Sequence, residues 1–354
     1  MSKNQLIGID LFAGAGGLSL GAEQAGIKVK YAIENEKNAA ETYRTNHKKT
    51  ILIEKDISCV NLSEISVDRE ECILFGGAPC QGFSSSNRRT NNKNNPKNWL
   101  YLEFLRILNG IWPSYFVFEN VTGLLNLDSG AFFKKILSDF ESIGYKCTCS
   151  VLNAADFGVP QNRKRLFIVG SRRGNVYNLS SSKKRRKVTV AEAFHDLPEL
   201  SNGAFIDAVP YSCRADSTYA KKMRGNQDIC TGHLVSKNAQ YVIDRYQYIE
   251  PGENWAAIPA ELMMNYRDRS RCHTGIYYRL RPDEPSLVIG NYRKNMLIHP
   301  YENRGLSVRE AARLQSFPDR YVFKGTLGFQ QQQVGNAVPP LLAKHVFKTI
   351  TDNI

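Results

Sequence analysis

LIGIDLFAGAGG, residues 6–17, is the stretch that decides the fold of this chain. Its apolar first half predicts a buried strand over residues 6–12, and the glycines that follow predict a turn. Residues 18–25 have the composition of a helix. Glycines between a strand and a helix let the backbone pass close to a ligand, and they leave the amides of the helix N-terminus accessible. The stretch therefore predicts a strand–turn–helix unit that binds a ligand at its turn.

The same alternation continues through the first 175 residues. At this spacing it predicts an α/β fold with a mostly parallel sheet covered on both faces. The predicted elements are strands at 28–33, 51–53, 73–75 and 115–118, a helix at 99–109, and a closing antiparallel pair at 146–152 and 165–169.

The second half of the chain has a different character. Residues 180–187, SSSKKRRK, predict a basic linker or domain entrance, and a nuclear-import patch is the less favoured interpretation. Residues 188–300 show no clear alternation and carry many Arg, Tyr and Asn. A helical pattern returns at 307–315 and again after Pro339 and Pro340.

Composition limits the possible functions. The net charge of +13 over 354 residues favours a polyanionic partner, with nucleic acid ahead of a membrane surface, although a generally basic protein is the simpler alternative. No apolar run reaches bilayer length and no signal-peptide layout is visible, so a cytoplasmic location is expected. The eight cysteines include no CxxC pair, which predicts a reduced intracellular protein without a zinc site.

Two acidic residues accompany the glycine turn. Glu34 ends the second predicted strand about 20 residues after Gly14, the usual place for a carboxylate that binds ribose hydroxyls. Asp56 ends the next unit and is suited to accept from an adenine amino group, while Phe12 is suited to stack on the base. These residues predict a nucleoside cofactor; a glycine turn beside ordinary surface carboxylates is the alternative.

Cys80 is the nucleophile candidate. It follows a short apolar strand in the run GGAPCQGF, residues 76–83, where glycine and proline force a turn at the sheet edge. Glu119 emerges from the next apolar strand at the same edge, as a candidate acid. Strand alternation is expected to place Arg163 and Arg165 on one face, where two guanidinium groups suit a phosphate or a polarised carbonyl. The alternatives are a packed cysteine, an ion-paired glutamate and solvated arginines.

Taken in order, these motifs resemble those of the C5-cytosine DNA methyltransferases, in particular the bacterial restriction-modification type. The resemblance extends over nearly all of the chain. It is carried by residues 10–17, 77–84, 119–121 and 161–165, and by the final blocks 309–319 and 333–340. It implies a Rossmann-like sheet that uses S-adenosylmethionine, releases S-adenosylhomocysteine and needs no metal.

The resemblance also implies a mechanism on double-stranded DNA. The thiolate of Cys80 adds to C6 of a flipped-out cytosine, Glu119 protonates or hydrogen-bonds N3, Arg165 holds O2, and Arg163 supports a loop or phosphate. Loss of the C5 proton then releases Cys80, and no base for that step is evident in the sequence. The implied cofactor-binding residues are Phe12, Gly14, Gly16, Gly17, Leu18, Glu34, Asn35, Asp56, Ile57, Pro79, Asn336 and Ala337.

The implied domains are a discontinuous catalytic domain, 1–170 with 302–354, and a smaller inserted target-recognition domain, 171–301. Residues 84–98 are expected to close over the flipped base. Within the recognition domain, contacts with base edges or phosphates are expected from some of five arginines: Arg267, Arg269, Arg271, Arg279 and Arg293. A monomer is expected, with a cognate restriction endonuclease as a further partner; an orphan methylase has the same sequence features.

Three other functions compete with this one. An RNA-directed member of the fold typically has a Cys-Phe-Thr tripeptide, which this chain lacks. A non-catalytic homologue predicts loss of Cys80 or Glu119, and both are present. A nicotinamide oxidoreductase explains only the glycine turn.

Overall fold

The computed structural model describes residues 5–79, 99–180, 186–266, 273–290, 292–294 and 296–354. The chain divides into two compact units. The first comprises Met1–Phe157, Lys164–Lys184 and Val338–Ile354, and the second comprises Gly158–Arg163 and Arg185–Ala337. These boundaries differ from those of the predicted domains, because the second unit includes much of the segment after residue 301. The assignment of catalytic and recognition domains stays a prediction.

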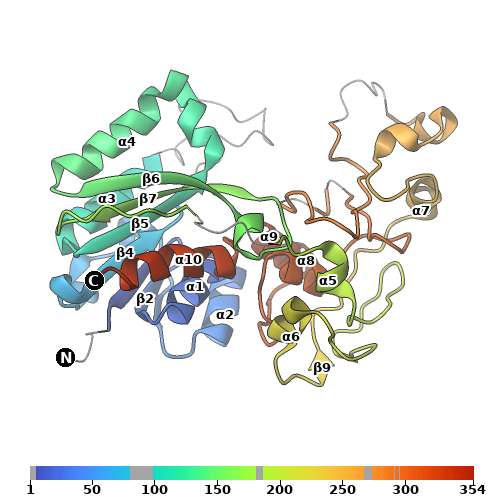
Figure 1. Ribbon diagram of the computed structural model, residues 1–354, viewed down its shortest axis with the longest axis horizontal. Helices are drawn as coiled ribbons and strands as arrows, with labels where there is room; N and C mark the ends of the chain where they lie inside the picture. The colour runs from blue at the N-terminus through green and yellow to red at the C-terminus, as the bar shows by residue number, and fades with distance from the viewer. Residues whose placement is uncertain (1–4, 80–98, 181–185, 267–272, 291, 295) are drawn as a thin grey trace. The chain divides into compact units, whose positions relative to one another are not determined.

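A mainly parallel sheet forms the centre of the first unit. Its described strands are β1 (Ile7–Leu11), β2 (Lys28–Ile33), β3 (Ile51–Ile53), β4 (Cys72–Gly76), β5 (Tyr115–Val121), β6 (Lys146–Asn153) and β7 (Lys164–Ser171). They lie in the order β3-β2-β1-β4-β5-β7-β6 (Figure 1). β7 runs antiparallel to both of its neighbours, and the other pairings are parallel. The chain order reverses between β1 and β4, whose carboxyl ends form the edge where α/β sheets bind ligands.

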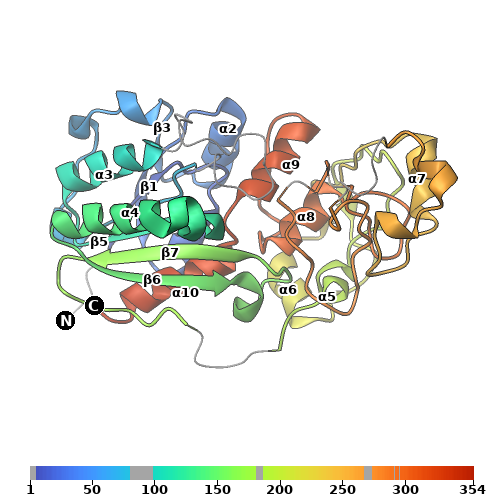
Figure 2. The same cartoon turned by 90° about the horizontal axis from the view of Figure 1, so that it is seen from above.

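Helices cover both faces of this sheet, as Figures 1 and 2 show. On one face, Phe104 and Phe140 pack against Phe116 and Phe118 of β5, with ring centroids 5.1 Å apart for Phe104–Phe118. On the other face, Phe347 meets Phe75 edge-on at 4.8 Å. The described α-helices of this unit are α1 (Gly17–Gln24), α2 (Lys37–Asn46), α3 (Leu100–Ile111), α4 (Ala131–Ser142) and α10 (Pro340–Thr351).

One glycine is required where α1 and α10 meet. A Cβ atom on Gly21 would lie 2.4 Å from Ala343 Cβ and 2.8 Å from the Lys344 backbone nitrogen. Since backbone atoms cannot move aside as a flexible side chain does, Gly21 allows the two helices their close approach. The chain after Pro340 is thereby packed against the helix that follows the glycine turn.

The second unit has less regular structure, as the sequence predicts. One small apolar cluster gathers Tyr246, Ile258, Met263, Tyr277 and Ile298. The described helices and strands of the second unit are α5 (Val190–Phe194), β8 (Val209–Pro210), α6 (Thr218–Arg224), β9 (Ile229–Cys230), α7 (Gln240–Tyr246), α8 (Val308–Leu314) and α9 (Leu327–Asn336).

The predicted α/β alternation is confirmed, and the helices expected at 99–109, 307–315 and after Pro340 are present. Six of the described helices, α2, α4, α5, α6, α7 and α9, were not predicted from the sequence. No helix within the described residues has the length and apolar character needed to cross a membrane.

Candidate functional site

The glycine turn after β1 has a left-handed backbone. Phe12, Gly14 and Gly16 have φ values of 59°, 56° and 86°, and the Gly16 amide donates to the carbonyl of Ala13 at 2.9 Å. A Cβ atom on Gly14 would meet no atom of the described residues within 4 Å. Glycine at position 14 therefore serves the backbone conformation, while the space beside it stays open.

Glu34 is bound to this turn by backbone amides. Gly14 N donates to Oε2 at 2.7 Å, while the amides of Asn35 and Glu36 donate to Oε1 at 3.0 and 2.8 Å. Burial raises the pKa of Glu34, and the three amide bonds oppose that shift. A carboxylate accepts about four hydrogen bonds, so roughly one acceptor position remains for a ligand.

Asp56 lies close to the same group of residues. Asn35 Nδ2 donates to Asp56 Oδ2 at 3.2 Å, and the Ser58 amide and hydroxyl donate to Oδ1 at 3.0 and 2.6 Å. The Ser58 bonds lower the pKa of Asp56, which stays an ionised acceptor. Arg106, which the sequence analysis missed, holds this segment by donating to the Ile57 carbonyl at 2.9 Å. The predicted residues Gly14, Glu34, Asn35 and Asp56 are thus brought together.

The other predicted cofactor residues have mixed surroundings. Leu18 and Ile57 are buried, and Phe12 packs partly against the core. Gly17 is the first residue of α1. Asn336 and Ala337 belong to the second unit.

The turn after β4 is fixed by close backbone contacts. A Cβ atom on Gly76 would lie 2.1 Å from the Leu11 carbonyl oxygen, and one on Gly77 would lie 2.6 Å from Glu119 Oε2. Asn120 Nδ2 donates to the Ala78 carbonyl at 3.1 Å. The description of this turn ends at Pro79, and Cys80 lies outside the described residues.

Glu119 and Arg165 form an ion pair at this sheet edge. Glu119 on β5 lies opposite Phe167, and Val121 lies opposite Arg165, so both charged side chains occupy the same face of the sheet. Arg165 Nε is 2.9 Å from Glu119 Oε1, and both side chains are largely buried. Burial lowers the pKa of Arg165, and Glu119 opposes that shift. The sequence left an ion-paired glutamate open as an alternative; the structure has that pair, and the partner is another predicted site residue.

Arg163 has a different environment from Arg165. β7 begins at Lys164, so strand alternation does not extend to Arg163, and the expectation of one shared arginine face stays a prediction. Within the second unit, Arg163 is buried and donates to the Asn336 carbonyl at 3.3 Å. Gln161 donates to the Leu314 carbonyl at 3.0 Å. The two arginines therefore have different partners, and residues 161–163 connect the two final sequence blocks.

The prediction that Arg279 contacts DNA is wrong. Its guanidinium is buried and donates to the carbonyls of Ile249, Tyr246 and His299, the last at 3.0 Å. These bonds make Arg279 a structural residue of the second unit. Arg293 is exposed, whereas Arg267, Arg269 and Arg271 lie outside the described residues.

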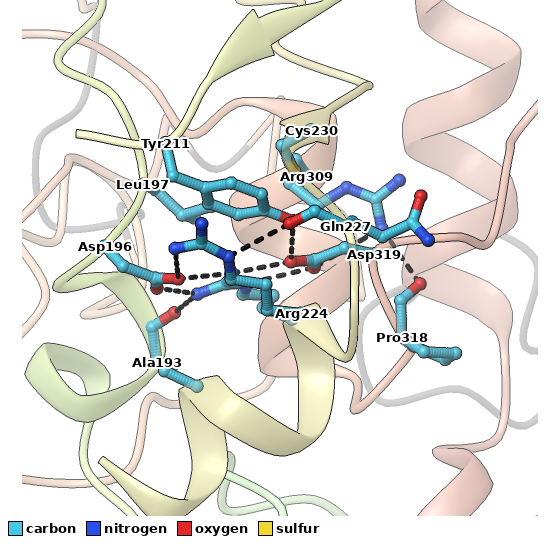
Figure 3. A network of polar contacts seen from close by, with 12 residues as sticks. Ala193, Asp196, Leu197, Tyr211, Arg224, Gln227, Cys230, Arg309, Pro318 and Asp319 are labelled. Atoms are coloured by element: carbon cyan, nitrogen blue, oxygen red, sulfur yellow. Dashed lines mark hydrogen bonds and ion pairs between the residues drawn. The ribbon is translucent and has the colours of Figure 1, made fainter. Parts of the chain in front are cut away.

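Buried arginines also organise the segment around α8. Arg313 Nη2 and Nε lie 2.6 and 2.9 Å from the two oxygens of Asp319, and Arg313 also pairs with the fully buried Asp196. Tyr211 donates to Asp319 at 2.7 Å. Figure 3 shows the polar groups of Asp196, Tyr211 and Asp319 pointing into the same network of polar contacts. Burial alone would raise the pKa of Asp319, but the bonds from Arg313 lower it.

Replacing Arg313 with methionine is expected to destabilise the second unit by about 3–5 kcal/mol, because two buried carboxylates lose their closest cationic partner. Their remaining arginines, Arg224 and Arg309, lie farther away, at 3.7 and 3.9 Å. The lowered pKa of Asp319 implies stability that is present above its unfolded pKa near 4 and lost as the pH falls through its folded value. Chemical denaturation at pH 7 and pH 3 tests both points. Arg281→Met is the control: its exposed pair with Asp283, 3.1 Å apart, is worth about 0–1 kcal/mol. Equal losses in the two variants would contradict the structural role of Arg313.

No group of three or more His, Cys, Asp or Glu residues suited to a metal occurs among residues that the structure describes. The candidate site consists of the glycine turn after β1 with its bound carboxylates, and of the ion pair between Glu119 on β5 and Arg165 on β7.

Sheet order and site together define a Rossmann-like methyltransferase fold. A crystal structure described as a DNA modification methyltransferase encoded within an E. coli prophage aligns with a TM-score of 0.80 and 26% identity, covering 98% of this chain and 99% of that one. The family model for C-5 cytosine-specific DNA methylase matches residues 6–352.

Curated relatives agree with this match. The Type II methyltransferase M.DdeI of Desulfomicrobium norvegicum is 33% identical over 97% of this chain and 88% of its own length. The Type II methyltransferase M1.HphI of Haemophilus parahaemolyticus is 35% identical over 97% and 86%. The chain belongs to the C-5 cytosine-specific DNA methylase family and is a DNA (cytosine-5-)-methyltransferase.

Proposed function

We propose that the protein transfers a methyl group from S-adenosylmethionine to C5 of a cytosine flipped out of a specific double-stranded DNA sequence, through a covalent bond between Cys80 and C6. The observation that carries this proposal is the Glu119–Arg165 pair. It lies beside Gly77, three residues before Cys80, at the carboxyl edge of the sheet. An acid and a guanidinium at that position match the two polar groups that a pyrimidine ring presents at N3 and O2.

The glycine turn suits the cofactor. Gly14 faces open space, and Glu34 and Asp56 present carboxylate oxygens that accept from ribose hydroxyls and an adenine amino group. Beyond Gly14, Glu34 and Asp56, the residues proposed to hold the cofactor are Phe12, Gly16, Gly17, Leu18, Asn35, Ile57, Pro79, Asn336 and Ala337. When bound, S-adenosylmethionine supplies the methyl group as an electrophile, and S-adenosylhomocysteine is the product.

The residues of the chain prepare the base for that methyl group. The Cys80 thiolate forms a bond to C6 and shifts the electron pair of the 5,6 double bond toward C5. Glu119, in its protonated form when the base is bound, gives a proton to N3 and Arg165 holds O2, so the ring accepts the added charge. After methylation, C5 carries a proton as well as the methyl group. Transfer of that proton to a solvent base restores the 5,6 double bond and expels the Cys80 sulfur as a thiolate, and N3 returns its proton to Glu119.

The DNA must leave its stacked geometry for this reaction. The charge of +13 suits a duplex partner, and residues 171–301 are proposed to recognise its sequence. Arg163 acts here through the Asn336 carbonyl and so as a positioning residue. We further propose a cytoplasmic monomer that protects DNA from a cognate restriction endonuclease, in line with the Type II names of its relatives.

Methyl transfer from labelled S-adenosylmethionine to unmethylated genomic DNA, with tRNA in parallel, tests the proposed function. The expected result is label in DNA at cytosine C5, mapped to one recurrent sequence by bisulfite treatment. Label in tRNA alone would move the activity to RNA. Silence on both substrates would contradict the proposal and favour a non-catalytic homologue.

A further inference from the structure

One buried carboxyl near the glycine turn has no place in the proposed chemistry. Asp10, the fourth residue of β1, is completely buried. The hydroxyl of Ser19 donates to its Oδ2 atom at 2.7 Å, and the Ser19 oxygen lies 2.7 Å from the Tyr43 hydroxyl. Asp10 Oδ1 has no hydrogen-bond partner in the part of the chain that the structure describes.

The contact with Ser19 spans the glycine turn. Asp10 precedes the turn, and Ser19 is the third residue of α1, which follows it. Their side chains therefore connect the strand and helix on either side of residues 12–16. Within the turn, Gly14 binds Glu34, so the Asp10–Ser19 contact and the Gly14–Glu34 contact hold one short loop.

The surroundings of Asp10 disfavour a negative charge. Its neighbours in the sheet register, Ala32 and Phe75, are apolar. The ionisable groups nearby are Glu34 at the end of β2, Glu23 on α1, Tyr43 on α2, and His47, which follows α2 and stacks on Tyr43. His47 is engaged by Glu23 at 2.9 Å. Asp10 thus faces two other acids and no cationic partner of its own among the described residues.

We propose that Asp10 is a positioning residue for the glycine loop and acts as a neutral carboxylic acid, whose hydrogen-bonded contact with Ser19 joins the two ends of that loop. A carboxylate with one unpartnered oxygen in an apolar site costs several kcal/mol, whereas the neutral acid is tolerated. Burial raises the pKa of Asp10 to about 8, with Glu34 adding to the shift and Ser19 opposing it. Ionisation above that pH places a charge beside Glu34 and loosens the loop.

The consequence is a pH limit on cofactor binding, which rests on the proposed function insofar as this loop binds S-adenosylmethionine. Binding of S-adenosylhomocysteine to the full chain is measured by calorimetry from pH 6.5 to 9.5. The ratio of the wild-type Kd to the Asp10→Asn Kd is expected to be flat up to pH 8 and to rise tenfold per pH unit above it, since one proton is linked to binding. Asparagine mimics the neutral acid, and the ligand's own ionisations cancel in the ratio.

Two further variants separate this role from simple packing. Asp10→Ala removes the contact and is expected to weaken binding about 5–10-fold at pH 7, with Asp10→Asn restoring it. Ser19→Ala removes the hydroxyl bond that favours the charged form and leaves the backbone amide of residue 19 in place, so the onset of weakening moves to higher pH. A ratio of the two Kd values that stays constant across the whole range overturns the proposal.

A ligand-free measurement distinguishes failure of this proposal from failure of the proposed function. If the wild type binds no S-adenosylhomocysteine at any pH, the cofactor assignment fails, while carboxyl carbon NMR of aspartate-labelled protein still gives the charge state of Asp10. A titration step near pH 8 that is absent in Asp10→Asn, or displaced upward in Ser19→Ala, supports the neutral acid. A step near pH 4 overturns it.

Discussion

Replacing Cys80 with serine is expected to lower methyl transfer to DNA about 10⁴-fold or more. The reaction requires an anionic nucleophile that adds to C6 and later leaves. A serine hydroxyl is a much weaker acid than a thiol, so its anion is far scarcer at neutral pH. The neighbouring turn does not depend on the thiol, because Asn120 and Glu119 contact Ala78 and Gly77. Label transfer at saturating cofactor and DNA measures the effect.

A trapping experiment tests whether the Cys80 sulfur forms a covalent bond to C6. In DNA that contains 5-fluorocytosine, C5 carries fluorine, which cannot leave as a cation, so the bond between sulfur and C6 persists after methylation. The wild type is expected to give a protein–DNA band that survives denaturation, and Cys80→Ser none. Cys213→Ser is the matched control, since Cys213 is exposed and its sulfur contacts only the His195 carbonyl among the described partners, at 3.6 Å. Near-wild-type incorporation by Cys80→Ser would remove this cysteine from its assigned role.

The centre of the sheet was predictable because strands β4 and β5 contain short apolar runs. Residues 72–76 and 115–118 are entirely buried, so nothing polar interrupts the pattern. Helix α2, in contrast, was missed because its buried face consists of Ala39, Ala40, Thr42 and Tyr43. Small and polar residues give little periodic signal, and only packing against the sheet reveals that face.

Arginine was the residue type that sequence reasoning misjudged. Arg279 was expected to contact DNA because arginine is usually a surface residue. The chain instead buries Arg163, Arg279, Arg309 and Arg313, each bonded to backbone carbonyls or carboxylates. Such partners come from residues distant in sequence, such as the Arg313–Asp196 pair, so spacing alone cannot predict them. The net charge of the chain therefore overstates the number of arginines free to meet DNA.

The Glu119–Arg165 pair also shows which features of the site the sequence predicts and which it does not. Glu119 was predicted from its place after an apolar strand, and Arg165 from its own motif. Their ion pair arises only from the antiparallel register that sets Val121 opposite Arg165. Register depends on pairing between segments distant in the sequence, so the sequence indicated both residues but did not predict their ion pair.

Glu119→Gln is expected to lower kcat about 10²–10⁴-fold while the Kd values for cofactor and DNA change little. Glutamine has nearly the same size and still accepts from Arg165, so the geometry beside Gly77 is retained. It cannot, however, transfer a proton to N3, and the ring then accepts the electrons from Cys80 addition less readily. Single-turnover label transfer measures the chemical step, and the fluorocytosine adduct is expected to form correspondingly slowly.

The control must remove an ion pair without touching this edge. Asp352, just after α10, forms such a pair with Lys348 at 3.0 Å, and both side chains are exposed. Asp352→Asn is expected to keep kcat within about twofold, because an exposed pair contributes little. If Glu119→Gln also kept its rate within that range, proton transfer from Glu119 would be excluded, and its pair with Arg165 would have a structural role alone. A loss of rate confined to Glu119→Gln, with unchanged Kd values, assigns the effect to the transition state, since binding of the ground state is then intact.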